Sequence, residues 1–471
     1  MGAEWKQYIK HIIADPKRIL TDEADLNSYA FDASFGHYLP ELVVQPIHRD
    51  EVVQLVQLAN EYKIPLYPRG QATCLSGGPL PVEGGIVLDL SKWNQKLEID
   101  VEDLTATVSP GVLTADIQQA ALQHGLFYPP DPSSSKVSTI GGNVAENSGG
   151  PRGLKYGVTG DYVLGLEVVT PQGKVIRTGG RTIKNVTGYN LTKLIVGSEG
   201  TLGVVTEIIL RLIPKPKASV SLMAIFDSII DAGKSISKVL SSGILPAAME
   251  IMDQECIKAV ENFKPSGLPI DAAAIVLIEL DGHPQAIKDE LEQVKEICEE
   301  LGARRVELAH TPEEAAKLWE ARRMVSPAIA KIKPTKISED ATVPRSQIPA
   351  MFERLHQIRD KYNLNLVVFG HAGDGNLHPN ILTDIRDKEE MKRVERAITE
   401  IFEAALELGG TLSGEHGIGT MKAPYMEMEL GQDGLDMLRR VKEAWDPNNI
   451  MNPGKIFPKP GVTKLVLTDD H

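Results

Sequence analysis

The chain has 471 residues, 42% of them hydrophobic and 24% charged, which is the composition of a globular protein with room for roughly two to four domains. Its 50 basic and 64 acidic side chains give a net charge of -14 without a basic stripe, so no nucleic-acid partner is expected. No apolar run reaches the length of a membrane span, and the N-terminus lacks the apolar stretch of a signal peptide. Three scattered cysteines favour reduced thiols in a cytoplasmic protein and exclude a four-cysteine iron–sulfur cluster held by this chain.

The first predicted elements lead into a glycine-rich loop. Residues 42–45 and 64–68 predict strands, and Asp50 is expected to cap the helix between them. The second strand runs into residues 69–78, RGQATCLSGG. N–H and hydroxyl groups in such a loop can hold a pyrophosphate, although the spacing is that of neither a Rossmann loop nor a P-loop. On its own, a loop of this kind is more often a turn than a ligand site.

A second and longer loop changes that interpretation. Residues 129–157, PPDPSSSKVSTIGGNVAENSGGPRGLKYG, hold six glycines among many Ser, Thr and Asn side chains and few apolar ones. Such a stretch cannot stabilise a core by itself, and long loops in compact domains are usually functional. A third element, residues 194–207 (LIVGSEGTLGVVTE), predicts a strand–turn–strand with three glycines.

These three loops, in this order over residues 40–214, resemble the FAD-binding domain of the vanillyl-alcohol oxidase (PCMH-type) superfamily. The resemblance implies that the first two loops hold the pyrophosphate of FAD and that the third lies along its adenine and ribose. Many members attach the flavin through a His in or near the first loop. Here that loop contains no His, so FAD is expected to be bound noncovalently. The residues that the resemblance implies for cofactor binding are Arg69, Gly70, Gln71, Ala72, Thr73, Ser76, Gly77, Gly78, Pro130, Asp131, Ser135, Thr139, Gly141, Gly142, Asn143, Asn147, Ser148, Gly149, Gly150, Gly153, Tyr156, Gly200, Gly203, Val204, Val205 and Asn452.

The second half of the chain predicts a separate cap domain for the substrate. Strands expected at residues 220–226, 272–280 and 304–308 alternate with helices, one of them at residues 286–301. This alternation is typical of an α+β domain, which we expect to be built on a mixed sheet.

A helix that begins at Thr311 with a capping box carries two adjacent arginines. Arg322 and Arg323 can each belong to a solvated face or bind a substrate carboxylate, for which a planar bidentate donor is the preferred group. Arg322 is preferred for the second role because it shares a helix face with Trp319, but Arg323 stays open.

The sequence VVFGHAGDGNLHPN, residues 367–380, indicates a metal site. An apolar strand ends there in a turn that carries His371, Asp374, Asn376 and His378, with the two histidines placed for the two sides of a loop. Histidines that converge with a carboxylate are the usual ligands of a divalent cation. A second glycine-punctuated segment, residues 411–419, adds Glu415 and His416, which we expect at a strand end and pointing opposite ways.

With the flavin loops, these two motifs resemble the FAD-linked D-2-hydroxyacid dehydrogenases, a family that includes D-lactate dehydrogenase, D-2-hydroxyglutarate dehydrogenase and the flavin subunit of glycolate oxidase. The resemblance implies that His371, His378 and Glu415 hold a divalent metal, Zn or Mn. It implies that His416 acts as the base, that Arg322 binds the carboxylate, and that Asn376 touches the substrate or the ligand shell. Asp374 then holds the turn or a ligand histidine.

The reaction expected from these parts is the oxidation of glycolate or D-lactate to the 2-oxo acid, with the hydride passing to FAD. A lysine that some D-2-hydroxyglutarate enzymes place before the strand at residues 338–344 is not clearly matched, because Lys336 lies out of register. D-2-hydroxyglutarate dehydrogenase is therefore the alternative. A metal-independent flavin oxidase of the same fold, or an accessory flavoprotein that only relays electrons, would lack a use for the metal cluster.

The predicted architecture is α+β, with a PCMH-type FAD-binding domain at residues 1–217, a cap domain at 218–410 and a C-terminal helical segment at 411–471 that returns to the flavin site. The chain shows no second redox centre, so electrons are expected to leave to a quinone, an electron-transfer flavoprotein or an iron–sulfur subunit. A homodimer or an oxidase complex is the expected assembly, in the cytoplasm or held at the inner face of the membrane through partner subunits.

Overall fold

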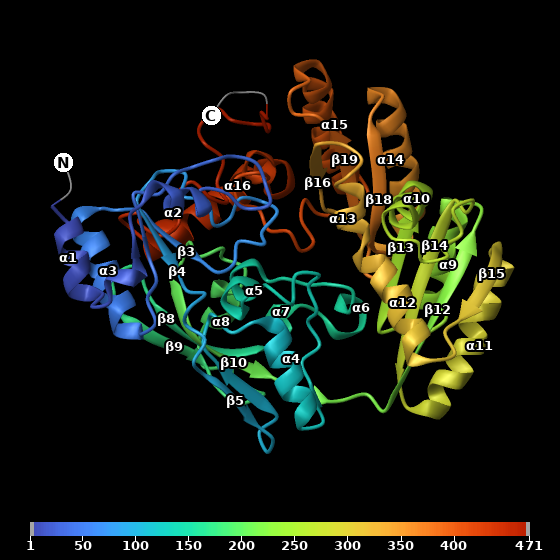
Figure 1. Ribbon diagram of the computed structural model, residues 1–471, viewed down its shortest axis with the longest axis horizontal. Coiled ribbons are helices and arrows are strands. Elements are labelled where there is room, and N and C mark those ends of the chain that lie inside the picture. The colour runs from blue at the N-terminus through green and yellow to red at the C-terminus, as the bar shows by residue number, and fades with distance from the viewer. Residues whose placement is uncertain (1–3, 468–471) are drawn as a thin grey trace.

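The computed structural model describes residues 4–467, so the predicted domain limits at residues 1 and 471 lie outside the described part. Figure 1 shows two bodies side by side, and the chain passes from the first to the second once before the C-terminal helix α16 returns to the first. The helices of the first body are α1 (Lys6–Ile12), α2 (Glu23–Ser28), α3 (Arg49–Tyr62), α4 (Thr114–Gln123), α5 (Ile140–Glu146), α6 (Gly153–Tyr156), α7 (Thr159–Tyr162), α8 (Leu191–Ile195) and α16 (Met426–Trp445).

Two sheets form the first body. The smaller has the order β1-β2-β4-β3, with β2 and β3 parallel to β4, and packs against α1 and α3. The larger has the order β5-β6-β10-β8-β9 and is antiparallel throughout. The strands are β1 (Ile19–Leu20), β2 (Leu42–Val44), β3 (Leu66–Arg69), β4 (Ile86–Asp89), β5 (Leu97–Asp100), β6 (Thr105–Val108), β8 (Val163–Val169), β9 (Val175–Gly179) and β10 (Val204–Arg211), with β7 (Leu126–Phe127) and β11 (Ile213–Pro214) as a separate pair.

The second body, the cap, is built on one eight-stranded sheet in the order β15-β12-β14-β13-β18-β19-β16, with β17 paired to β19. Its strands are β12 (Ala218–Phe226), β13 (Ala248–Asp253), β14 (Ala274–Gly282), β15 (Ala303–Leu308), β16 (Thr335–Ser338), β17 (Ala341–Thr342), β18 (Asn365–His371) and β19 (Asn376–Thr383). Its helices are α9 (Ile229–Ser241), α10 (Gln254–Phe263), α11 (Pro284–Glu300), α12 (Pro312–Arg323), α13 (Val325–Ile329), α14 (Ile348–Tyr362) and α15 (Lys388–Glu407).

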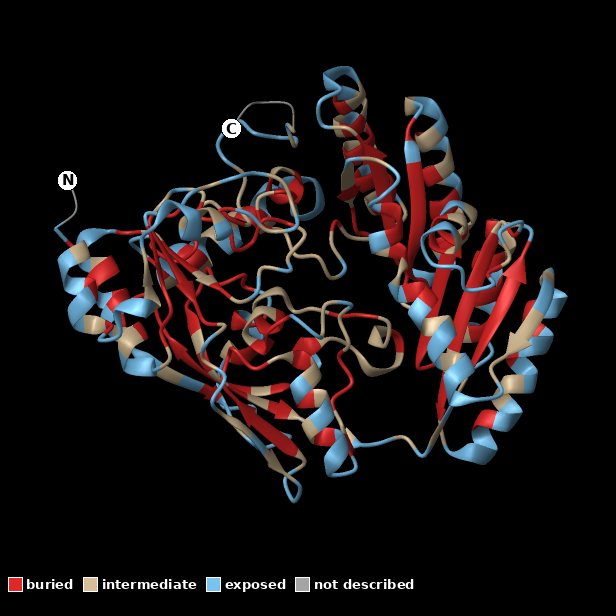
Figure 2. Ribbon diagram, viewed as in Figure 1, coloured by how far each residue is buried: buried red, intermediate tan, exposed pale blue. Residues whose placement is uncertain are grey.

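Successive residues of the cap strands enter two different cores because side chains alternate across a strand. Ile251 of β13 packs in the core beneath α9, α11, α14 and α15, whereas the next residue, Met252, packs in the core beneath α10 and α13. Helices therefore cover both faces, and Figure 2 shows the sheet buried with the exposed surface on the outer sides of the helices. This explains the long uninterrupted apolar runs of the cap strands.

Four local predictions are wrong. Residues 194–207 are not a strand–turn–strand, because Asn190 caps the short helix α8 and strand β10 begins only at Val204. Helix α3 has His48 at its N-cap position, and Asp50 lies in its first turn instead. The cap sheet is not mixed, since every described pairing in it is antiparallel. The segment with Glu415 and His416 is a loop that follows one isolated bridge between Thr342 and Thr411.

Across residues 4–467, no helix has both the length and the apolar composition that crossing a membrane requires.

Candidate active site

A cavity of about 810 Å³ lies between the two bodies, and both contribute to its wall. The first body supplies residues from the two glycine-rich loops and from the turn before β10. The cap supplies residues from α12, β16, β18 and β19, together with the loop that carries Glu415 and His416. Segments that are far apart in the sequence thus meet at one space.

Sixteen of the residues expected to bind the cofactor line this cavity. They are Arg69, Gly70, Gln71, Ala72, Thr73, Gly78, Asp131, Ser135, Thr139, Gly141, Gly142, Asn143, Ser148, Gly200, Gly203 and Val205. A side chain at Gly70 would collide with the Thr139 hydroxyl, so the two loops approach each other as closely as their backbones allow. The wall offers backbone and hydroxyl groups of small residues, which fits the pyrophosphate and ribityl chain of FAD.

The other expected cofactor residues lie off the cavity wall: Ser76, Gly77, Pro130, Asn147, Gly149, Gly150, Gly153, Tyr156, Val204 and Asn452. Several hold the loops together instead. Asn147 ends α5 in a left-handed conformation and accepts a hydrogen bond from Gly160 N, and Asn452 donates to the backbone oxygens of Gly78 and Glu199. Tyr156 donates to Asp281 of the cap. Even Arg69, which lines the cavity, donates to backbone oxygens, of Tyr29 and Phe31.

The two histidines of the expected metal site flank a hairpin turn between β18 and β19. Strand pairing places His371 opposite Asn376 and His378 opposite Phe369, so both histidines project from the same face of the sheet. Their ring centroids are 5.0 Å apart. Gly375 closes the turn with a φ of 87°, a conformation that favours glycine.

The three expected metal ligands converge. Glu415 Oε1 lies 2.9 Å from His371 Nε2 and 3.3 Å from His378 Nε2, and all three side chains have little exposure. Burial alone would lower the pKa of His371, but Glu250 and Glu415 outweigh it and raise that pKa well above its usual range. Two imidazole nitrogens and one carboxylate oxygen around one point are the ligand set of a divalent cation site such as that of zinc, so the residues fit a metal.

Each of these histidines has a buried carboxylate on its other nitrogen. Glu250 Oε1 lies 2.6 Å from His371 Nδ1, and Asp340 Oδ1 lies 3.7 Å from His378 Nδ1. Asp340 also shapes the loop, because its Oδ2 accepts hydrogen bonds from the backbone N–H groups of residues 414–416. Carboxylates in these positions fix the orientation of ligand histidines.

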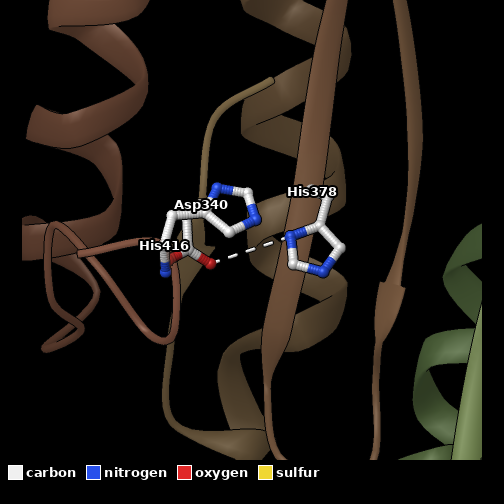
Figure 3. Close-up of side chains that lie close together, drawn as sticks. All are labelled: Asp340, His378 and His416. Carbon is white, nitrogen blue, oxygen red and sulfur yellow. Dashed lines mark hydrogen bonds and ion pairs between the residues drawn. The ribbon is translucent and has the colours of Figure 1, made fainter. Parts of the chain in front are cut away.

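His416 lies on the opposite edge of His378 from Glu415. Its ring stacks on that of His378 with centroids 5.0 Å apart and an interplanar angle of 9°, and Figure 3 shows both imidazoles beside Asp340. Burial lowers the pKa of His416 to about 4 in spite of the Asp340 charge. The imidazole is therefore neutral at pH 7 and able to accept a proton.

The two arginines of α12 differ in environment. Arg322 is buried, with its Nη2 2.5 Å from Glu250 Oε2 and its guanidinium over the Phe369 ring, whereas Arg323 lines the cavity but is mostly exposed. Lys336 of β16 also lines the cavity and donates to Ser326 Oγ at 2.7 Å. Burial lowers the pKa of Lys336.

Asn376 and Asp374 support the hairpin. Asn376 lies off the cavity wall, and its Oδ1 accepts a hydrogen bond from the Thr342 hydroxyl at 3.1 Å. Asp374 accepts from the Asn376 backbone N–H at 3.2 Å, which agrees with the role of holding the turn.

Residues 215–456 match the protein family described as FAD linked oxidases, C-terminal domain, and residues 40–179 match the family described as FAD binding domain. The glycolate oxidase subunit GlcD of Bacillus subtilis is 50% identical over 455 residues, which cover 96% of this chain and 97% of that protein. The D-lactate dehydrogenase of Archaeoglobus fulgidus is 36% identical over 443 residues, 92% of this chain and 96% of that protein. The chain belongs to the FAD-linked oxidase family.

Solved structures confirm the fold expected for an FAD-linked oxidase of the PCMH type. The structure of p-cresol methylhydroxylase with substrate bound matches with a TM-score of 0.79 at 19% identity, covering 96% of each chain. The 4-ethylphenol oxidase from Gulosibacter chungangensis matches with a TM-score of 0.79 at 20% identity, covering 98% of each chain.

Three residues of this FAD-linked oxidase site were missing from the predicted set. Glu250 is the acid in the apolar strand sequence AMEIM, and an acid in such a run is a signal that it has a buried partner. Asp340 stands just before β17, where nothing local indicates that it reaches the loop after Gly414. Lys336 was set aside on register, yet the strand pairing of β16 with β19 brings it to the cavity.

Proposed function

We propose that this FAD-linked oxidase oxidises a small 2-hydroxy acid, glycolate or D-lactate, to the 2-oxo acid with noncovalently bound FAD. The observation that carries the proposal is that Arg322, His371, His378, Glu415 and His416 line the same cavity as the flavin loops. Relatives named as a glycolate oxidase subunit and as D-lactate dehydrogenases support it.

The substrate carboxylate would bind to Arg322, helped by Lys336. Arg322 presents a planar guanidinium whose Nε is buried and has no partner among the described residues. Lys336 brings a second cation to the same wall. Two cations and a cavity narrowed by Phe369 and Trp319 suit a short acid with one charged end.

His416 would take the hydroxyl proton of the substrate. It is neutral, it lines the cavity, and its position beside Asp340 gives the proton a nearby negative charge to face. FAD in the adjoining loops would receive the hydride from the substrate carbon, which is chemistry of the cofactor. The protein residues therefore bind, orient and deprotonate the acid.

His371, His378 and Glu415 would hold a divalent metal, Zn or Mn. Such a cation polarises a substrate oxygen and stabilises the negative charge that develops there. Asp340 and Glu250 would keep the ligand histidines in the orientation that the cation requires.

The electrons would leave to an external acceptor. Two of the three cysteines are buried and the third is half-buried, and none pairs with another in a cluster motif. The name of the Bacillus subtilis relative, a subunit, supports assembly with partner chains, among which an iron–sulfur subunit, an electron-transfer flavoprotein or a quinone-reducing subunit would accept electrons. We place this assembly in the cytoplasm or at the inner face of the membrane.

Lys336 keeps D-2-hydroxyglutarate as the second candidate substrate. A lysine on the cavity wall can bind a second carboxylate, and burial of its ammonium favours a charged partner. Whether Lys336 serves the first or a second carboxylate separates the two substrates.

The deciding experiment is anaerobic mixing of the FAD-loaded protein with glycolate, D-lactate, L-lactate and D-2-hydroxyglutarate while flavin absorbance is followed. We expect rapid bleaching with glycolate or D-lactate. Bleaching by D-2-hydroxyglutarate alone would establish the second candidate. Absence of bleaching by every acid would contradict the proposed function, and bleaching that survives complete removal of metal would identify a metal-independent oxidase.

A further inference from the structure

Glu250 is a buried carboxylate in the middle of the cap sheet. Its strand β13 lies between β14 and β18, and the side chain has no solvent exposure. An ionised carboxylate in such a place is strongly unfavourable unless it is paired. Its partners therefore matter more than those of a surface acid.

The two oxygens of Glu250 meet two different groups of the site. Oε1 lies 2.6 Å from His371 Nδ1, and Oε2 lies 2.5 Å from Arg322 Nη2. On the far sides of these partners, His371 Nε2 faces Glu415 and the Arg322 guanidinium lies on the cavity wall. One carboxylate thus stands between the group expected to bind the substrate acid and a ligand of the expected metal.

We propose that Glu250 is a positioning residue that sets both halves of the site at once. With an ionised Glu250, His371 carries its proton on Nδ1 and keeps Nε2 free for the metal. The same charge holds the Arg322 fork against Phe369, so that its unpartnered Nε faces the substrate. This inference rests on the proposed roles of Arg322 and His371.

The test is the variant Glu250→Gln, which keeps the size of the side chain but replaces one acceptor oxygen by an amide donor. It cannot accept from both His371 and Arg322. We expect a 10- to 100-fold loss of Zn²⁺ or Mn²⁺ affinity, measured without substrate by competition with a metal-sensitive dye. In metal-saturated enzyme we expect KM for the 2-hydroxy acid to rise more than kcat falls.

Glu279→Gln is the matched control, because Glu279 is a poorly exposed acid of the neighbouring strand β14 that lines the same cavity and contacts no ligand histidine. It should keep the wild-type metal affinity. Retention of FAD and the circular dichroism spectrum report folding of each variant. If Glu250→Gln does not fold, Glu250→Asp decides, since it keeps the charge but is one methylene too short to meet both partners.

Wild-type metal affinity and KM in Glu250→Gln, or in Glu250→Asp, would overturn the inference. That outcome differs from a failure of the proposed function, which would appear in the wild-type protein as no metal bound or no bleaching by any 2-hydroxy acid. A loss in Glu279→Gln as large as in Glu250→Gln would also overturn it, because it would show a general effect of removing buried charge from this sheet.

Discussion

His416 is the one imidazole of the cluster that is free for proton transfer. His371 and His378 both turn Nε2 toward Glu415, whereas His416 stacks on His378 and lies next to the cavity. Burial keeps it neutral at physiological pH. A neutral imidazole in contact with the cavity is what proton removal from a hydroxyl requires.

Replacing His416 by Ala should slow flavin reduction by about 100-fold or more, because the substrate proton then has no acceptor. Anaerobic stopped-flow absorbance measures the rate. FAD should stay bound, since His416 lies on the cap side of the cavity, and His124→Ala, at an exposed position after α4, is the control. Loss of FAD from the His416 variant, or unchanged reduction, would contradict the assignment.

Glu339 gives the molecule a dependence of stability on pH that is separate from catalysis. The side chain is buried without a printed partner in hydrogen bonding, and burial raises its pKa to about 7. The folded state therefore binds this proton more tightly than the unfolded state. Stability from this group is present at acid pH and is lost as the pH rises through about 7.

For Glu339→Gln we expect the free energy of unfolding to fall less between pH 5 and pH 8 than in the wild type, by on the order of 3 kcal/mol at most. Urea unfolding at the two pH values measures this difference. Glu292→Gln, at an exposed position of α11, should follow the wild type. Parallel pH profiles of Glu339→Gln and wild type would refute the prediction.

At the scale of elements, the hairpin of β18 and β19 positions the metal ligands. The strands are paired over seven residue pairs, which fixes both histidines on one face. Gly375 permits the tight turn, because its φ is positive and a Cβ would meet the Val343 carbonyl. A change in the turn would therefore shift one histidine relative to the other.

Gly375→Ala should destabilise the protein by about 1–3 kcal/mol and weaken metal binding, because it adds backbone strain and a steric clash at the turn. Thermal unfolding and metal titration measure the two effects. Gly302→Ala is the control, since Gly302 also has a positive φ but has open space around its Cβ position. It should lower stability without changing metal affinity, and equal metal loss in both variants would argue against the hairpin as the cause.

At the scale of the whole molecule, the chain after the cap joins the two halves of the site. Lys442 of α16 donates to the backbone oxygens of Thr201 and Met451, and Glu199 accepts from the backbone N–H groups of Ile418 and Gly419. The C-terminal segment thus fastens the flavin loops to the loop with Glu415 and His416. We propose that this segment acts as the third unit, next to the FAD-binding and cap domains.

Because flavin and metal sites are held by different segments, chelation should separate them. Dialysis against a strong chelator should abolish bleaching by the 2-hydroxy acid while the FAD absorbance remains, and added Zn²⁺ or Mn²⁺ should restore bleaching. Metal analysis of the active protein is the control. Full activity in protein shown to be free of metal would contradict the assignment of His371, His378 and Glu415.

The sequence by itself determined the cofactor class, the order of the flavin loops and the convergent histidines. Glycine-rich loops and a His-containing strand end are local signals, because a turn, a close approach or a ligand requires particular residues at a particular spacing. The local errors, such as the missed helix α8, arose where apolar residues fit a short helix as well as a strand.

Only the tertiary structure decided which charges meet. Glu250 reaches His371 from a strand 121 residues away, and Asp340 reaches the loop at Gly414 across 74 residues. Sequence spacing carries no information on such pairs, since sheet order and loop path bring them together. The choice of Arg322 over Arg323 followed in the same way, because burial against Glu250 and Phe369 depends on how α12 packs on the sheet.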